Sequence, residues 1–314
     1  MKIFLSVITY LIVFNLTMAD DSAIIPADVL SRAKLVQKEL DLIRFEMGKP
    51  LQKQKELTVK DADPREVYFQ ALILYKKINH LLDEQVENKG VEIDYVTTVK
   101  IRSSHVYSVV NKALKKIYKI KKKLKIRESH TAEKMPETST SSDVFKTIFQ
   151  VNRQLNLVLN QQASESDSYM QIDKSIYIIN DILKTIKKEE VFIEKPRFIR
   201  GKTPKDVYKE LVDSYLLLQK VFKNSKLKIL ELDVNKISII DQSPGDVFDL
   251  STLILAEVTY LQNKLGSKTT KPMNYPGRVL PSHVFQRVGS LKNLLTEFEF
   301  HSRKDPRWFR ENDR

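Results

Sequence analysis

The chain contains no cysteine among its 314 residues. This absence excludes disulfide bonds, thiol catalysis, cysteine-ligated metal sites and lipid attachment through an N-terminal cysteine. Glycine is scarce, with seven in the whole sequence, which leaves little provision for tight turns and favours helices. The His-Glu-x-x-His, Gly-x-Ser-x-Gly and glycine-rich phosphate-loop motifs are also missing. No cofactor, metal site or catalytic residue is therefore predicted, although a Ser/His/Asp site assembled from distant residues remains an open alternative.

Long hydrophobic runs are missing except at the N-terminus. Lys2 supplies a positive start, residues 3–16 form the apolar run, and Thr17-Met18-Ala19 resembles a small-residue cleavage site. Because the run is shorter than the ~20 residues that span a bilayer, residues 1–19 are predicted to be a signal peptide cut after Ala19. An uncleaved membrane anchor is the alternative. A signal peptide on a chain without cysteine favours a periplasmic or secreted protein.

A helix-start motif recurs along the chain and is clearest in Thr203-Pro204-Lys205-Asp206-Val207-Tyr208. Threonine before a helix accepts a hydrogen bond from an unpaired amide, and proline at the first helical position loses no hydrogen bond. The acidic residue three positions after the cap bonds back to the cap and lies at the positive end of the helix dipole. The valines of the seven copies are Val29, Val67, Val106, Val144, Val207, Val247 and Val284.

Apolar side chains recur at 4, 7, 11 and 14 residues after each of these valines. Only Ser214 and Ser251 interrupt the pattern. Steps of this kind form one stripe on an α-helix, and a strand cannot produce them. The aromatic residue after most of the valines is predicted to widen this buried stripe rather than to line a ligand groove. An eighth stripe, without a start signal, comprises Ile172, Ile176, Ile179, Leu183 and Ile186.

The spacing of the motif predicts the fold class. Neighbouring valines are 37 to 40 residues apart, with one gap of 63. Such self-similarity is typical of stacked units that are each too small to bury their own apolar face. The sequence therefore predicts an all-α fold of eight amphipathic helices in a degenerate repeat of about 38 residues, stacked as a helical repeat array or an irregular bundle. Parallel and alternating helix directions both remain open, since the linkers can run back along a helix of ~30 Å.

The stretches between the helices suggest a domain organisation. Residues 20–127 hold the first three helices. Residues 128–142 are rich in Ser, Thr and Glu and are predicted to form a flexible linker. Residues 143–300 hold the other five helices, and residues 301–314 form a polar tail.

Three finer predictions concern the arrangement of these elements. The short polar connection at 161–167 predicts an antiparallel hairpin of the fourth and fifth helices. Residues 226–240 alternate partly and are predicted to run extended against the helices. The valines at 29, 67 and 106 match those at 207, 247 and 284 with offsets of 178, 180 and 178 residues. These offsets suggest a duplicated three-helix unit around a two-helix middle.

Polar residues occupy one position of the repeat, three residues after each cap. If the helices are parallel, these side chains gather on one face, which would suit cation or proton binding. Helix capping explains the acidic ones without any ligand. Histidine is a poor cap because its positive form opposes the helix dipole, so capping does not explain His105 and His283. The candidate site residues are His105, His283, Asp143, Asp206 and Asp246.

Basic residues are in excess, and the net charge of +13 favours an acidic partner or surface. The densest run lies on the helix that follows Val106. This run could contact anionic lipid or polysaccharide, whereas secretion argues against nucleic acid. The alternative is a solvated polar face of an amphipathic helix. The anion-binding candidates are Lys115, Lys116, Lys119, Lys121, Lys122, Lys123 and Lys125.

Together these features predict a non-enzymatic, secreted or periplasmic helical-repeat protein. It is expected to act as an interaction scaffold or binding module for another envelope or secreted protein, or for a second copy of itself. The alternative is a binder of anionic membrane surfaces or polysaccharides through the helix Lys115–Lys125. A hydrolase or metal-dependent activity around His105 and His283 is the third hypothesis.

Overall fold

The structure is a computed structural model. It describes residues 24–51, 58–86, 100–159, 165–232, 242–266 and 277–309. The predicted signal peptide with its cleavage site after Ala19 lies outside these residues, as do the end of the predicted tail and most of the stretch 226–240.

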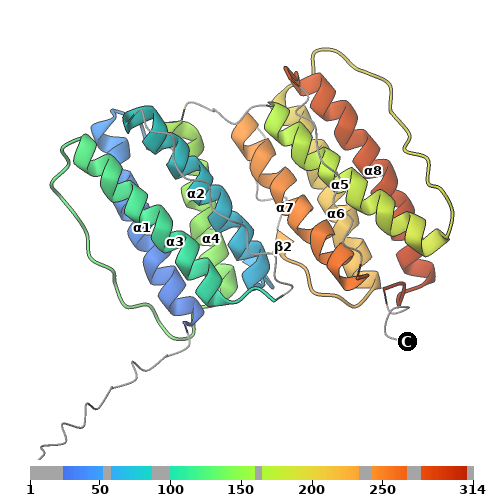
Figure 1. The fold of residues 1–314 in the computed structure, drawn as a ribbon, viewed down its shortest axis with the longest axis horizontal. Helices are drawn as coiled ribbons and strands as arrows, with labels where there is room; N and C mark the ends of the chain where they lie inside the picture. The colour runs from blue at the N-terminus through green and yellow to red at the C-terminus, as the bar shows by residue number, and fades with distance from the viewer. Residues whose placement is uncertain are drawn as a thin grey trace, which may run out of the picture.

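Eight α-helices and one short strand pair form the described fold, which confirms the predicted all-α class (Figure 1). The first four helices are α1 (Pro26–Glu46), α2 (Pro64–Val86), α3 (Ser103–Lys123) and α4 (Ser141–Val158). The second four are α5 (Glu165–Lys187), α6 (Pro204–Asn224), α7 (Pro244–Lys264) and α8 (Pro281–Lys304). Strands β1 (Val59–Lys60) and β2 (Glu231–Leu232) pair antiparallel.

The predicted stripes form the core. The residues at 4, 7, 11 and 14 positions after each of the seven valines are at most 3% exposed. Ser214 and Ser251 are also buried, and their hydroxyls donate to backbone carbonyl oxygens of their own helices at 2.9 Å. Four aromatic residues that follow the valines are buried as well, which confirms that they widen the core: Tyr68, Phe145, Tyr208 and Phe248.

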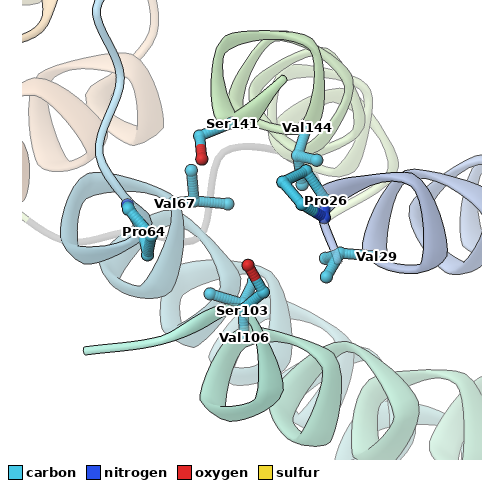
Figure 2. A pocket seen from close by; sticks show the side chains of 8 residues that line it. All are labelled: Pro26, Val29, Pro64, Val67, Ser103, Val106, Ser141 and Val144. Carbon is cyan, nitrogen blue, oxygen red and sulfur yellow. The ribbon is translucent and has the colours of Figure 1, made fainter. Parts of the chain in front are cut away.

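The helices within each half of the molecule are parallel, because their N-termini meet around one small cavity. The first turns of α1, α2, α3 and α4 line this cavity in the first half (Figure 2). The first turns of α5 to α8 line an equivalent cavity in the second half. Each has a volume of about 10 Å³, which leaves room for no more than one water molecule. Each linker within a half therefore returns the chain along the full helix length of ~31 Å.

Each half is a four-helix bundle with the same order of neighbours. Around the first bundle the order is α1, α3, α2 and α4, and around the second it is α5, α7, α6 and α8. Val67, Val106 and Val144 thus correspond to Val207, Val247 and Val284, which lie 140, 141 and 140 residues further on. The repeated unit therefore has four helices, and the predicted three-helix duplication is wrong. Helix α5, the true counterpart of α1, lacks the start motif. A comparison of the start motifs alone therefore matched α1 with α6.

The two bundles pack head to tail through α2, α4 and α7. Arg65 at the start of α2 contacts Glu257 near the end of α7, and Lys77 further along α2 contacts Asp249 near the start of α7. The C-terminal end of the first bundle therefore lies at the same end of the molecule as the N-terminal end of the second (Figure 1). Helix α4 packs against α1 and α2, whereas α5 packs against α7 and α8, so the predicted α4–α5 hairpin is wrong.

Residues 128–142, predicted to be a flexible linker, are attached to α1. The Ser129 hydroxyl and the backbone N–H of His130 donate to the carboxylate of Glu39. Met135 is buried in the core. The helices on both sides, α3 and α4, belong to the same bundle, so the chain divides between α4 and α5 rather than at this segment.

The predicted polar tail also differs from expectation. Helix α8 continues to Lys304, beyond the predicted boundary at residue 300. Trp308 is buried, with its ring 4.9 Å from that of Phe298 and its indole N–H donating to Ser225. The tail residues up to 309 thus cover the C-terminal end of the second bundle.

Candidate functional site

The acidic candidates cap the helices on which they lie. Asp143 accepts a hydrogen bond from the backbone N–H of Thr140 at 2.8 Å, and Asp206 accepts one from Thr203 at 2.9 Å. Asp246 closes the same capping box with its own N-cap residue. The backbone hydrogen bond from Thr203 lowers the pKa of Asp206, because it stabilises the charged carboxylate.

His105 and His283 are caps too, which corrects the prediction that capping does not explain them. Nδ1 of His105 accepts a hydrogen bond from the backbone N–H of Arg102 at 3.0 Å. Nδ1 of His283 accepts one from Leu280 at 3.1 Å. A neutral imidazole has one unprotonated nitrogen, so it can replace a carboxylate in this role. The conflict with the helix dipole holds only for the positive form, which has no acceptor nitrogen.

Parallel helices bring these residues to one end of each bundle without assembling them into a site. Each side chain turns back to the start of its own helix. No group of His, Asp and Glu side chains within the described ranges is arranged to hold a metal ion. His105 and His283 belong to different bundles that lie head to tail, so they are at opposite ends of the molecule and cannot share one centre.

The predicted basic helix is α3, and its lysines have two different environments. Lys121 is buried and paired with Glu39, and Lys116 donates to the side-chain oxygen of Asn79. Burial would raise the pKa of Glu39, but the hydrogen bond from Lys121 lowers it below its usual value. The last turn of α3 lies where four parallel helices present the negative ends of their dipoles, which favours cations there. Among the seven predicted anion-binding lysines, the exposed ones are Lys115, Lys119, Lys122, Lys123 and Lys125.

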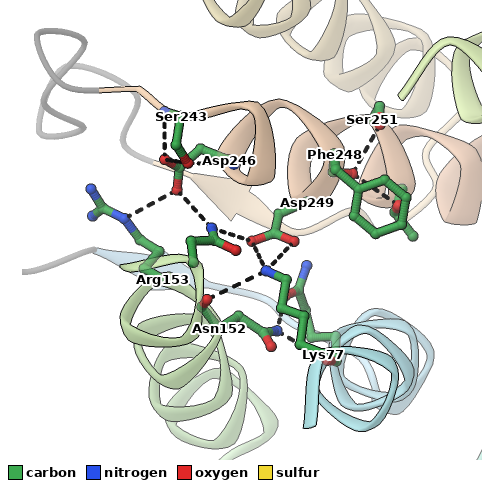
Figure 3. Close-up of polar contacts among 11 residues, drawn as sticks. Lys77, Asn152, Arg153, Ser243, Asp246, Phe248, Asp249 and Ser251 are labelled. Carbon is green, nitrogen blue, oxygen red and sulfur yellow. Dashed lines mark hydrogen bonds and ion pairs between the residues drawn. The ribbon is translucent and has the colours of Figure 1, made fainter. Parts of the chain in front are cut away.

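A buried polar network that was not predicted from the sequence lies between the bundles (Figure 3). The ammonium of Lys77 is 2.7 Å from both carboxylate oxygens of Asp249, and both side chains are almost fully buried. Lys77 also donates to the carbonyl oxygen of Asn152 at 3.3 Å. The side-chain amide of Asn156 reaches Asp246 at 3.3 Å and Asp249 at 3.4 Å. These contacts join α2 and α4 of the first bundle to α7 of the second.

A second buried cluster joins the bundles through Arg65. Its guanidinium lies 2.7 Å from Glu66 and 3.2 Å from Glu257, and it donates to the carbonyl oxygen of Lys228 at 3.0 Å. The same group lies 3.9 Å from the ring centroid of Tyr260, a cation–π contact. Glu66 and Glu257 are completely buried, and Oε1 of each accepts no aligned hydrogen bond from a described donor.

The two glutamates of this cluster hold protons more strongly than exposed glutamates do. Burial raises the pKa of Glu257 well above its usual value, and the negative charge of Glu66 raises it further against the opposing effect of Arg65. Burial also raises the pKa of Glu66. Arg65 cannot balance both buried carboxylates, particularly because it also lies 3.0 Å from the carboxylate of Asp63, so the cluster favours retention of a proton on the Glu66–Glu257 pair.

A groove of about 670 Å³ opens close to the Arg65 cluster, between the last turns of α6 and the segment 227–232. Its size falls within the ~300–1,000 Å³ that is typical of ligand sites. The apolar lining residues are Leu216, Leu227, Ile229 and Leu232. The polar lining residues are Lys220, Lys223, Lys228, Asp61, Gln219 and Glu231. We call this space the junction groove.

Both bundles hold the wall of the junction groove that residues 227–232 form. Arg65 of α2 binds the carbonyl oxygen of Lys228 from the first bundle. Tyr215 and Gln219 of α6 donate to the carbonyl oxygen of Leu230 at 2.8 and 3.0 Å. Pairing of β2 with β1 adds a further link between the bundles. The shape of the groove therefore depends on the docking of the two bundles.

Sequence reasoning missed both the buried clusters and the junction groove, because each is assembled from distant segments. One local signal was present. Asp249 lies between Phe248 and Leu250, and Glu257 lies between Ala256 and Val258, so each carboxylate interrupts an apolar stretch of α7. A charged residue in such a position is rarely buried unless it is paired, and therefore points to a buried partner elsewhere in the chain.

Comparison of the chain with protein-family models, with curated proteins and with solved structures finds no match. Across the described residues, none of the helices combines the length and the apolar character needed to cross a membrane. The function therefore has to be inferred from the geometry of the chain itself.

Proposed function

We propose that the chain is a non-enzymatic binding module, secreted or periplasmic, that holds a segment of another protein in the junction groove. The observation that supports this proposal is the groove itself, which combines apolar and charged lining residues and is open to solvent. The cavities inside the two bundles are far smaller and admit at most one water molecule.

The lining of the groove indicates the chemistry of the partner. Leu216, Leu227 and Leu232 can bury apolar side chains, whose removal from water favours binding. Lys220 and Lys223 add positive charge at its edge, which attracts carboxylates and steers their approach. The fitting partner is an acidic and apolar segment of an envelope or secreted protein, or of a second copy of this chain.

One further feature favours a binding function over a catalytic one, and another favours secretion of the chain over its retention inside the cell. The histidines and most of the carboxylates of the repeat are occupied as helix caps, as His105 and Asp206 show. The N-terminal residues 1–19 have the composition of a cleavable signal peptide.

Photo-crosslinking tests the groove directly. A benzophenone amino acid replaces Lys220, and the chain is expressed in cells that secrete it. We expect one protein adduct, which disappears when Lys223→Glu is added because the rim then repels acidic partners. The matched control carries the benzophenone at Lys119, an exposed lysine on α3. The same adduct from both positions, or no adduct from Lys220, would contradict the proposal.

The exposed lysines of α3 support a second candidate function, contact with an anionic membrane surface or polysaccharide. Lys119 and Lys122 are exposed and form no ion pair with another described residue. Lys119→Glu with Lys122→Glu should weaken binding to anionic vesicles or to an acidic polysaccharide, and unchanged binding would remove this candidate. Lys121 is left intact in this test, because its charge reversal would leave the buried Glu39 without its cationic partner.

A further inference from the structure

One end of the molecule carries basic and apolar side chains from both bundles. Because the bundles lie head to tail, this end comprises the last turns of α1 to α4 and the first turns of α5 to α8 (Figure 1). We call it the basic end. It includes the segment 195–205, which leads into α6, and the exposed lysines at the end of α3.

The segment 195–205 is strongly basic, with five basic residues and no acidic one. It is fixed to the first turns of α8, since the backbone N–H of Lys202 donates to Ser282 at 3.1 Å and Gln286 donates to the carbonyl oxygen of Pro196 at 2.6 Å. Its exposed cations that form no ion pair with another described residue are Lys195, Arg197, Arg200 and Lys205.

Apolar side chains project among these cations. Phe198 is 37% exposed, Ile199 is 47% exposed and Leu280 at the start of α8 is 49% exposed. The ring of Phe198 lies 5.1 Å from that of His283, whose imidazole caps α8. A solvated basic surface would need no such residues, whereas aromatic and aliphatic side chains between cations are typical of elements that enter a membrane interface.

The first bundle contributes the same combination at this end. Lys122, Lys123 and Lys125 are exposed where α3 ends. Phe45 in the last turn of α1 is 78% exposed, and Leu51 shortly after α1 is 63% exposed. Cations and apolar side chains thus occur together on both bundles at this end of the molecule.

We propose that the basic end docks on an anionic phospholipid surface. The lysines and arginines contact the lipid phosphates, while Phe45, Phe198 and Ile199 enter the headgroup region. An acidic polysaccharide would satisfy the cations but would leave the apolar side chains in water. The junction groove lies near the opposite end, because the last turns of α6 and Asp61 just before α2 line it. A docked molecule would therefore present the groove away from the membrane.

Vesicle co-sedimentation of the mature chain tests this proposal. We expect binding to vesicles of phosphatidylcholine mixed with phosphatidylglycerol, and no binding to phosphatidylcholine alone. Arg197→Glu with Arg200→Glu should weaken binding at least about tenfold, since each basic side chain near the surface adds attraction. Phe198→Ser with Ile199→Ser should remove the part of the binding that persists at high salt, which screens charges but not apolar insertion.

Two matched charge reversals serve as controls. Arg303→Glu with Lys304→Glu alters the C-terminal end of α8, where Phe300 is also exposed, at the opposite end of the molecule. Lys220→Glu with Lys223→Glu alters the junction groove and separates this proposal from the binding of a protein partner. Both controls should bind anionic vesicles as the unaltered chain does. If all the charge variants lose binding equally, the binding depends only on the net charge of the chain, and the proposal is overturned. Absence of binding to both kinds of vesicle would also overturn it.

Discussion

The interiors of the two bundles are mainly apolar, apart from the buried Lys121–Glu39 pair of the first bundle, whereas the junction between the bundles is rich in buried charged residues. Inside each bundle the stripes are apolar, and the serines that interrupt them bond to their own helix. At the junction, Lys77 pairs with Asp249, and Arg65 lies between Glu66 and Glu257. Burial of apolar surface therefore stabilises each bundle, whereas the junction combines hydrogen bonds and charges that must be matched.

The apolar interiors determine how the helices of each bundle pack, whereas the charged junction determines how the two bundles are placed against each other. Apolar contacts tolerate small shifts, so they hold a bundle together without fixing how a second bundle is placed against it. Buried charges are costly unless they meet their partners, so they disfavour other placements. The junction therefore specifies one relative position of the bundles, and with it the shape of the groove that both bundles form.

The largest expected effect comes from removing one charge at the junction. Lys77→Met leaves Asp249 buried without its partner, which should lower the free energy of unfolding by about 3–5 kcal/mol. The paired change Lys77→Met with Asp249→Leu removes both charges and should restore most of this loss. Urea unfolding of the unaltered chain and of both variants measures the comparison, and a double variant as unstable as the single one would show that the charges are not coupled.

An interior substitution should produce a slightly smaller loss that stays within one bundle. Leu218 of α6 is completely buried in the second bundle. Leu218→Ala removes apolar surface and leaves a cavity, which should cost about 2–5 kcal/mol. Hydrogen exchange should show faster opening of α5 to α8 while α1 to α4 keep their protection. Equal loss of protection in both bundles would mean that they unfold as one unit.

The charged junction should also respond to pH, in the direction opposite to that of Glu39 inside the first bundle, whose pKa is lowered. In the folded chain the pKa values of Glu66 and Glu257 are raised, chiefly by burial. The folded state therefore keeps a proton that the unfolded chain loses above about pH 4.3. Stability from this site is fully present below that pH and is lost as pH rises through the raised folded pKa.

The variant Glu257→Gln tests this expectation, because glutamine stays neutral at every pH. Urea unfolding between about pH 4 and pH 8 should show a smaller fall in stability with rising pH than the unaltered chain shows. Glu46→Gln, a change at an exposed glutamate on α1, should leave the slope unaltered. The same slope in the chain with and without Glu257→Gln would mean that the buried carboxyl pair does not carry the shared proton.

The contrast between interior and junction also explains how much could be predicted. The stripe after Val106 follows from local periodicity, so the helices and their buried faces were predictable. Lys77 and Asp249 are 172 residues apart in the chain, and no local pattern links them. The four-helix unit was missed because α5 begins at Glu165 without the start motif, and only contacts between distant helices reveal its place in the second bundle.

The smallest expected effect concerns the helix starts, where histidine was wrongly expected not to act as a cap. His105 caps α3 through Nδ1, but a neutral imidazole adds no charge at the positive end of the helix. His105→Asp keeps the hydrogen bond to Arg102 and adds a negative charge, as Asp143 and Asp206 provide on their helices. We expect a stabilisation of about 0.3–1 kcal/mol, measured by urea unfolding at neutral pH.

The second histidine cap makes the comparison sharper. His283→Asp should gain the same charge at the start of α8, but it also removes the ring that contacts Phe198 at 5.1 Å between centroids. The net gain should therefore be smaller than for His105→Asp. Equal gains would mean that the Phe198 contact adds nothing to stability, and a loss for His105→Asp would mean that the imidazole does more at the start of α3 than close its cap.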